Sequence, residues 1–563
     1  MTQPLAHRFP TLGLLVLLVL PGAAPPRAQD QEDPPAPVTL SLQECLKTAL
    51  ENNLDIAVRR YEPQRSEALL MGQRAIFDPL LTGSGRSTED QRLLTFFPGA
   101  PLSTDKTHAF TAAFEDPLQF GGRYRLEINA NDNLNITDFA ASAEQSRSFE
   151  TTWKFTFTQP LLRNLGTAAN RWQILVATNS LGSSEARFRQ TVIDTLAGAE
   201  NAYWDLNFTL MDLKTKRGSL QLAKDFLDQN RTKVRVGTLA PIEITQAEAG
   251  VADREEGVIL AEHAVRTAED ALRRIMNVPR DSPVWSTPIQ PLDAPPLVES
   301  APDMAQAVAT AETHRPDLEE ARFQVRSREA ELHYRENQRR WGLDFQGSYG
   351  ALGADGGDPV LNGPFNYGNA LDDLRERNQD NWSLGLNLSV PIGNRQAIAN
   401  FTNAEHGLNQ ARYELLRLEQ LARLEVRNAA RTVDTNLKRV KAAQVNTRLQ
   451  REKLDAEQKK FQNGMSTSFQ VLQFQTDLAS AETRENLAIV DYNKSLVEME
   501  RVQGTLLEAR RMLIPGDAGG AHGGPPSGGP SAALPTHFGY SGRALVGLGG
   551  KPGAAGDPAD GGR

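Results

Sequence analysis

Short stretches in which apolar and polar residues alternate predict six strands. The clearest stretch runs from Trp382 to Val390, where five apolar residues alternate with Ser, Gly and Asn. Successive side chains of a strand point to opposite faces, so this alternation predicts one apolar face and one polar face. Further stretches of this kind predict strands at 80–86, 109–114, 124–130, 152–158 and 343–349.

Much longer stretches have apolar residues at steps of three and four, which is typical of helices. Between Leu408 and Val440 these residues form a narrow seam of Leu, Ala and Val, as in a coiled coil. A helix of this length spans on the order of 100 Å, which a globular domain seldom needs. The predicted long helices are 165–234, 241–276, 396–462 and 468–512, and shorter ones are expected at 41–76 and 304–341.

The sequence predicts that this order of helix, strands and two long helices occurs twice in the chain. The segment that starts at Lys233 can be laid without a gap on the segment that starts at Lys460, and each copy contains the bend between two long helices. The helix that starts at Leu42 matches the one that starts at Met304 in the same way. Self-similarity at a fixed offset predicts duplicated architecture. We therefore expect a first repeat at 41–278, an irregular Pro-rich connection at 279–302 and a second repeat at 303–512.

The two ends of the chain have a different composition. An Arg-containing start, an apolar run from Leu12 to Leu20 and small residues up to Ala28 predict a secretory signal peptide at 1–28. A Pro-rich lead-in follows at 29–40, and the Gly-, Pro- and Ala-rich segment 513–563 is expected to be disordered. No later stretch is long and apolar enough to predict a transmembrane helix.

Charge and motifs argue against several classes of function. The net charge of −9 disfavours nucleic-acid binding, which needs clustered cations. The eight histidines occur singly, without the spacing of metal ligands, and no nucleophile or phosphate-loop motif is present. We expect no enzyme activity, cofactor or metal. Cys45 is the only cysteine and is expected to be a small buried apolar residue.

The amphipathic strands need a partner that the rest of the chain does not supply. An ordinary half-buried sheet with a soluble core is one interpretation, but the remaining segments predict only long helices. The alternative is a membrane barrel with lipid outside and water inside. A bilayer tolerates no open sheet edge, and four to six strands are too few to close a barrel. Several copies would then share one barrel.

Four segments carry a resemblance to a known family. They are L-S-L-Q-E-C-L-K-T-A-L, which starts at Leu40, F-T-Q-P-L-L-R-N-L-G, which starts at Phe157, R-P-D-L, which starts at Arg315, and S-V-P-I-G-N, which starts at Ser389. Their order, their duplication and the two Gly-containing bends resemble the TolC-type outer-membrane efflux factors. The resemblance covers 40–508, nearly the whole chain after the signal peptide.

This resemblance implies a mixed α and β fold. In it, a homotrimer shares one transmembrane β-barrel, with four strands from each protomer, embedded in outer-membrane lipid. The barrel continues as a periplasmic α-helical coiled-coil tube. The implied function is the passive exit channel of a tripartite efflux or type I secretion system, with a periplasmic adaptor (membrane fusion protein) and an inner-membrane transporter as partners. The predicted hairpin at 109–130 is additional to the family's pattern, and two alternatives are open for it: it enlarges the barrel, or it lies outside it.

The resemblance also places the gate and the adaptor contact at the bends. Just after the second bend the family often has aspartates, where this chain has Gln470 and Gln473, and a typical Tyr and Arg are replaced by Phe461 and Ser466. A gate held by hydrogen bonds and packing is therefore implied, rather than a carboxylate ring. The alternative for the two glutamines is that they are solvated residues of a helix tip.

In the first bend Glu243 is the remaining acidic candidate, although an anion near a helix N-terminus is also favourable without any gating role. Gly residues at both bends suit a tight backbone turn. The candidate gate or adaptor-contact residues are Gly237, Thr238, Glu243, Gln246, Phe461, Gly464, Ser466, Gln470 and Gln473.

Two other functions compete with the channel. A periplasmic adaptor also combines a coiled-coil hairpin with β-structure, but it should have one hairpin rather than two. A coiled-coil protein of the cell envelope without a channel would have no use for the alternation between Trp382 and Val390.

Overall fold

The computed structural model describes part of the chain. The described residues are 37–95, 101–139, 142–279, 281–299, 303–357, 366–377 and 379–513. The chain divides into two compact units, 1–515 and 516–563, and all described residues belong to the first. The predicted signal peptide, most of the Pro-rich lead-in and nearly all of the predicted disordered tail lie outside the described residues.

Six long strands form one antiparallel sheet in the described part of the chain. They are β2 (Leu80–Leu93), β3 (Leu102–Pro117), β4 (Arg123–Phe139), β5 (Ser142–Pro160), β7 (Gly342–Gly357) and β8 (Gln379–Ser389). Their order in the sheet is β2-β3-β4-β5-β7-β8, so β2 and β8 are the edges and the sheet is open. A short helix, α10 (Tyr367–Glu376), contacts β5 and β7.

The strand count differs from the four strands that the family resemblance implied. The predicted hairpin at 109–130 lies within β3 and β4, which occupy the middle of the sheet between β2 and β5. β3 pairs with β2 from Leu102 to Glu115 and with β4 from Leu102 to Pro117. The sheet therefore holds all six predicted strands, two more than the four that the resemblance implied for the barrel, because the extra hairpin joins the same sheet.

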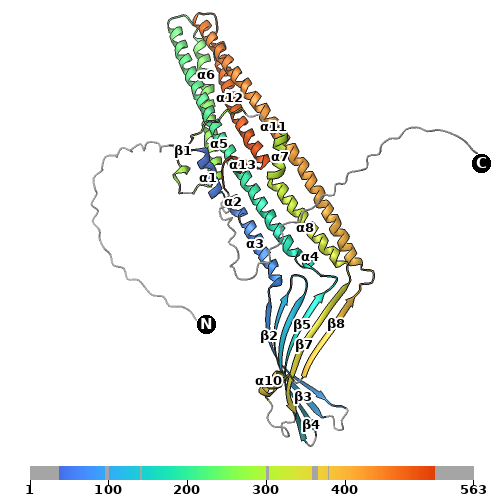
Figure 1. Cartoon of the computed structure of the whole chain (residues 1–563). Helices are drawn as coiled ribbons and strands as arrows, with labels where there is room; N and C mark the ends of the chain where they lie inside the picture. Colours follow the sequence, from blue (N-terminus) through green and yellow to red (C-terminus); the bar gives the residue numbers. More distant parts are fainter. Residues whose placement is uncertain are drawn as a thin grey trace, which may run out of the picture. The chain divides into compact units, whose positions relative to one another are not determined.

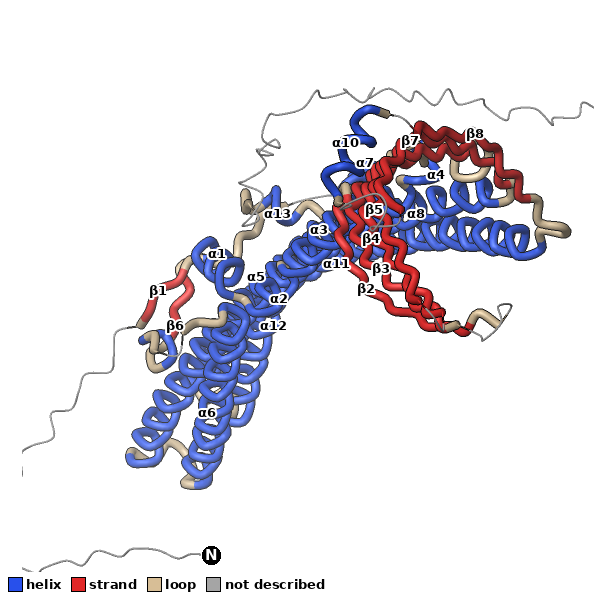
Figure 2. The backbone as a smooth tube through the Cα atoms, turned by 90° about the horizontal axis from the view of Figure 1, so that it is seen from below, coloured by secondary structure: helices blue, strands red, loops and turns tan. Residues whose placement is uncertain are grey.

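Four long helices form two hairpins that lie side by side. They are α5 (Trp172–Arg235), α6 (Ile242–Met276), α11 (Arg395–Gln462) and α12 (Ser468–Gln503). α5 packs against α6, α11 packs against α12, and α12 also packs against α5. The two bends lie at one end of these helices and the sheet at the other (Figure 1). Figure 2 shows the helices as neighbouring rods.

Several helix boundaries differ from the predictions. α5 begins at Trp172 rather than at residue 165, because a turn and the short α4 (Thr167–Asn170) come first, and the Asn170 side chain donates to two carbonyl groups of that turn. α12 ends at Gly504, which has a φ of 77°, and α13 (Leu506–Ala509) follows. The connection 279–302 is not wholly irregular, since it contains η2 (Pro283–Trp285) and β6 (Ile289–Pro291), which pairs with β1 (Val38–Leu40).

The two shorter predicted helices are interrupted. The first consists of α1 (Leu42–Asn52), α2 (Leu54–Arg59), α3 (Tyr61–Arg74) and η1 (Ala75–Phe77), and the second of α7 (Met304–His314) and α8 (Pro316–Gln338). Asn53 separates α1 from α2 and Arg315 separates α7 from α8, and both have extended backbone. The Asn53 side chain accepts from the first turn of α2 and donates to Ile275 O, and Arg315 pairs with Glu425 at 2.7 Å. A capping box of Ser41 and Glu44 starts α1.

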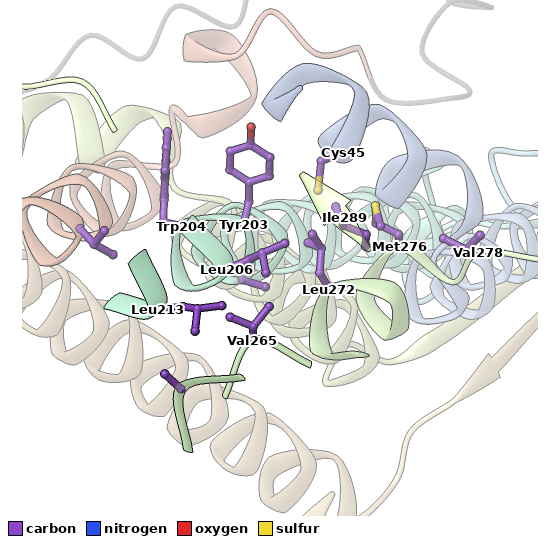
Figure 3. Close-up of a cluster of buried hydrophobic side chains, with 13 residues drawn as sticks. Cys45, Tyr203, Trp204, Leu206, Leu213, Val265, Leu272, Met276, Val278 and Ile289 are labelled. Atoms are coloured by element: carbon purple, nitrogen blue, oxygen red, sulfur yellow. The ribbon is translucent and has the colours of Figure 1, made fainter. Parts of the chain in front are cut away.

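The largest buried side chains lie where the short helices meet the long ones. Figure 3 shows Cys45 from α1 near Tyr203 of α5 and Leu272 and Met276 of α6. Cys45 is fully buried as expected, and burial raises the pKa of its thiol to about 12. Between α11 and α12 the seam is narrower and consists mostly of Val and Ala, which lets the helices approach closely.

Candidate functional site: the paired bends and the amphipathic sheet

Both bends have the same backbone geometry. Gly237 and Gly464 each have a φ of 77°, in the left-handed region that glycine adopts without a Cβ penalty. At the first bend Thr238 N–H donates to Lys233 O at 3.0 Å, and at the second Met465 N–H donates to Lys460 O at 2.9 Å. These bonds satisfy carbonyl groups that the helix end leaves without a partner. The two glycines thus end α5 and α11 in the same way.

The helices that leave the bends begin differently. At α12, Thr467 is the N-cap residue and its side chain accepts from Gln470 N–H. At α6, Pro241 is the N-cap residue and makes no side-chain capping bond. The second bend therefore has a polar side chain that fixes its helix start, and the first bend lacks one.

A buried carboxylate also stabilises the second bend. Glu457, in the last turns of α11, is 5% exposed and accepts a hydrogen bond from Ser466 Oγ. Its other oxygen lies 3.2 Å from Lys460 Nζ. The bond from Ser466 is the main reason why the pKa of Glu457 is lowered, and Lys460 lowers it further. Ser466 thus joins the loop of the bend to α11 and does not lie free at the tip.

The two bends are connected to each other through Phe461. The Lys233 ammonium donates to Phe461 O at 3.3 Å and lies 4.1 Å from the centre of the Phe461 ring. That ring is buried and packs against Phe226 of α5, with ring centres 5.1 Å apart. Phe461 is therefore a packing residue between the hairpins, and the Lys233 contact adds a cation–π attraction.

The other predicted candidates lie around this connection. A cavity of about 400 Å³ between the bends is lined by Thr238, Glu243 and Gly464, among others. Glu243 is half-buried, and one of its carboxylate oxygens is enclosed without a hydrogen-bond partner among the described residues. The structure places both bends together and leaves three candidate glutamines exposed, namely Gln246, Gln470 and Gln473.

Two features near the bends are not predicted by the sequence pattern. The first is a set of large apolar side chains that are more than half exposed, namely Val236, Ile242, Met465 and Phe469. Their signal in the sequence was their position next to the bends and off the helix seams. The second is a buried arginine in α6.

That arginine, Arg254, connects three helices. Its guanidinium donates to Ser219 Oγ of α5 at 3.2 Å, and to Leu472 O and Thr476 Oγ1 of α12 at 3.1 Å each. It is 9% exposed, and burial lowers its pKa. Because it bonds across the two hairpins, Arg254 holds them together a few turns away from the bends.

The sheet has one polar and one apolar face, as the alternation predicted. On the polar face Thr111 Oγ1 donates to Asn129 Oδ1 at 2.8 Å, and Arg125 bonds to Glu127 at 2.8 Å. On the opposite face Leu126 and Phe155 are paired across neighbouring strands and are 40% exposed each. Ordinary soluble sheets bury such a face against a second layer.

Within the described segments, no helix combines the length and the apolar character needed to cross a membrane. Nor does the described part of the chain contain a cluster of three or more His, Cys, Asp or Glu residues able to hold a metal ion.

The fold is that of outer-membrane channels of known structure. The chain is similar to the CmeC outer membrane channel of Campylobacter jejuni, with 15% identity, coverage of 83% of this chain and 86% of that one, and a TM-score of 0.57. It is also similar to VceC of Vibrio cholerae, with 14% identity, 82% and 96% coverage and a TM-score of 0.57. For the open state of MtrE of Neisseria gonorrhoeae the values are 16%, 83%, 89% and 0.56.

The family follows from the sequence itself. Residues 45–278 and 307–505 match the outer membrane efflux protein family, and the chain belongs to that family. The resemblance to TolC-type channels that the sequence suggested is thereby confirmed. No curated protein sequence matches this chain.

Proposed function

We propose that the chain is the passive exit duct of a tripartite efflux or type I secretion system. In this proposal three copies share one barrel in the outer membrane, and their helical hairpins form a tube in the periplasm. The energy for transport comes from an inner-membrane transporter. The observation that carries the proposal is the sheet. Its apolar face carries large exposed side chains, and its edge strands β2 and β8 have no second partner among the described residues.

The helices support the same function. At 64 and 68 residues, α5 and α11 are each on the order of 100 Å long, which suits a tube that crosses much of the periplasm. Two hairpins per chain argue against a periplasmic adaptor, and the exposed apolar sheet argues against an envelope coiled coil without a channel. The internal duplication that the sequence predicts would account for the two hairpins.

The test is whether the purified mature protein needs detergent, is a trimer and conducts ions. We expect a trimeric mass by light scattering in detergent and discrete conductance steps in planar bilayers. A monomer that is soluble without detergent and does not conduct would contradict the proposal. Its behaviour would then favour one of the two alternatives.

We further propose that the bends form the periplasmic gate and receive the adaptor. The exposed side chains Val236, Ile242, Met465 and Phe469 offer an apolar contact surface at the tip, and Gln470 lies in the first turn of α12. Because this tip has glutamines in place of a carboxylate ring, Gln470→Asp should introduce three charges per trimer and make conductance sensitive to block by cations. Gln420→Asp, also exposed but in the middle of α11, is the control. Identical cation block in both variants would remove Gln470 from the gate.

A further inference from the structure

The β3–β4 hairpin is the part of the sheet that has no counterpart in the second half of the chain. Its neighbours β2 and β5 correspond in sequence to β7 and β8: L-T-G-S-G in β2 matches F-Q-G-S-Y in β7, and T-Q-P-L at the end of β5 matches S-V-P-I at the end of β8. Each of these four strands is next to a helix in the chain. β2 follows α3, β5 precedes α4 and α5, β7 follows α8, and β8 precedes α11. β3 and β4 have no such helix beside them. The β3–β4 hairpin is thus an insertion between β2 and β5, which together with β7 and β8 make up the four strands shared by the two halves of the chain.

The inserted hairpin carries the same apolar band as the rest of the sheet. The cross-strand register places Phe114 opposite Leu126, and Leu126 opposite Phe155. The row continues from Phe155 to Tyr349 and from Tyr349 to Trp382. Ile128 of β4 is opposite Trp153 in the same way and is 46% exposed. An apolar row that continues across β3, β4, β5, β7 and β8 is what a lipid-facing wall requires.

The opposite face of the hairpin is polar and joined to β5. Asn129 accepts from Thr111 Oγ1 on β3, and its amide donates to Glu127 on its own strand and to Thr152 Oγ1 on β5. Arg125 also pairs with Glu115 across to β3. Charged groups bonded to one another along one face suit a water-filled lumen and would be costly in lipid.

The apolar band of the hairpin ends in charged pairs. Towards the far end of the strands, on the same side of the sheet as Phe110 and Ile128, Lys106 pairs with Glu89 at 3.2 Å and Asp132 pairs with Arg147 at 2.7 Å. An apolar band that gives way to ion pairs at the end of the strands is the profile of a wall that leaves the bilayer.

The usual spacings of strands and helices give the six-stranded sheet and the four helices that follow it about the same width. α3, α5, α8 and α11 pack in that order, and four helices at roughly 9 Å spacing cover roughly 36 Å. Six strands at about 4.8 Å, tilted by about 40°, cover roughly 38 Å, whereas four strands would cover only roughly 25 Å at the same tilt.

From these observations we propose that all six strands of each copy enter the wall of the shared barrel. β8 of one copy pairs with β2 of the next, and three copies of the six-stranded sheet close with 18 strands. An even number of strands makes this junction antiparallel, as every other pair is. This inference rests on the proposed trimeric channel. Since barrel diameter grows roughly linearly with strand number, the barrel is roughly one and a half times as wide as one with four strands per copy.

A matched pair of substitutions tests whether the hairpin is in the wall. Ile128→Arg places a charge on the lipid face of β4 and should lower the yield of detergent-stable trimer in the membrane at least about tenfold. Asn129→Arg places the same charge on the polar face, one residue along, and should leave the yield within about twofold. Leu384→Arg, on the apolar face of β8, calibrates the loss for a strand that faces lipid in either arrangement.

Electron cryomicroscopy of the wild-type trimer in lipid nanodiscs gives a second measurement that needs no variant. We expect 18 strands in the barrel. A trimer that conducts but has 12 strands, or tolerates Ile128→Arg as well as Asn129→Arg, would overturn this inference and leave the proposed channel intact. A protein that forms no trimer and does not conduct would overturn the proposed function itself.

Discussion

The two helix bends have the same backbone but are stabilised by different contacts. Both turn through a glycine with a φ of 77°, yet only the second has a side-chain N-cap, from Thr467, and a buried carboxylate, Glu457, that bonds to its loop. The first bend relies on its backbone, on the bond that Thr238 Oγ1 donates to Lys233 O, and on the contact of Lys233 with Phe461. Backbone geometry thus makes the bends alike, and side chains make the second one more firmly fixed.

The largest expected effect concerns the contact between the hairpins. Arg254→Met keeps an apolar stem of similar length but removes the bonds to Ser219, Leu472 and Thr476, and should destabilise the helical tube by about 2 kcal/mol. Thermal unfolding followed by circular dichroism, at fixed protein and detergent concentrations, measures the change. The control is Arg217→Met, which breaks an exposed pair with Glu262 and should cost less than about 1 kcal/mol. Equal losses would show that Arg254 does not connect the hairpins.

The next effect tests whether the two turns are equivalent. Gly237→Ala and Gly464→Ala should each destabilise the protein by about 1 kcal/mol, because alanine is disfavoured at positive φ. A Cβ at either position meets no atom within 4 Å, so steric clash does not contribute. The same thermal unfolding measurement should give equal shifts for the two variants. A much larger shift at Gly464 would mean that the second turn itself is more constrained.

A smaller loss of stability should distinguish the second bend from the first, because only α12 has an N-cap side-chain bond. Thr467→Ala removes the N-cap bond of α12 and should cost about 0.5 to 1 kcal/mol. Pro241→Ala, at the N-cap of α6, removes no capping bond and is the control. Hydrogen exchange of the first turns of the two helices would report the difference locally. Faster exchange in α12 alone is the expected outcome, and unchanged exchange in both would contradict the role of the cap.

The smallest effect is a pH dependence confined to the second bend. The pKa of Glu457 is lowered from its ordinary value of 4.5, mainly by the hydrogen bond from Ser466. A lowered folded-state pKa contributes stability above pH 4.5, and this contribution is lost as the pH falls through the folded value. The thermal midpoint should therefore drop less between pH 6 and pH 3.5 in Ser466→Ala than in the wild type. An identical drop in both would mean that the Ser466 bond does not perturb Glu457.

The sequence predicted most of the helical part and less of the sheet. The regular spacing of Leu, Val and Ala along the sequence predicted the first and last residues of α6 and α11 to within one residue. The strands were predicted too short, because their outer halves are polar on both faces. In β4, for example, Asn131, Asp132 and Asn133 show no alternation although they are paired.

Other features depend on tertiary contacts that no local pattern contains. The break at Arg315 had a signal, because the residue before a proline is disfavoured in a helix, but the break at Asn53 is set by its bond to Ile275 in another helix. Phe461 reads as a tip residue in the sequence, and only the packing of the two hairpins shows that it lies between them. The role of Arg254 likewise depends on how α6 faces α12.

The position of β7 in the sheet has a consequence for the order of folding. β2, β3, β4 and β5 follow one another both in the chain and in the sheet, as a meander. The next neighbour of β5 in the sheet is β7, and their ladder ends at the pair Pro160 and Asp344. The chain between these two residues contains the whole first helical hairpin. Closing so long a loop costs about 2 to 3 kcal/mol more entropy than closing a ten-residue one. We expect the ladder between β5 and β7 to form after the meander and after the contact between α5 and α6, and pulse-labelled hydrogen exchange should protect it last. Each subunit would then add its last two strands to a meander that has already formed.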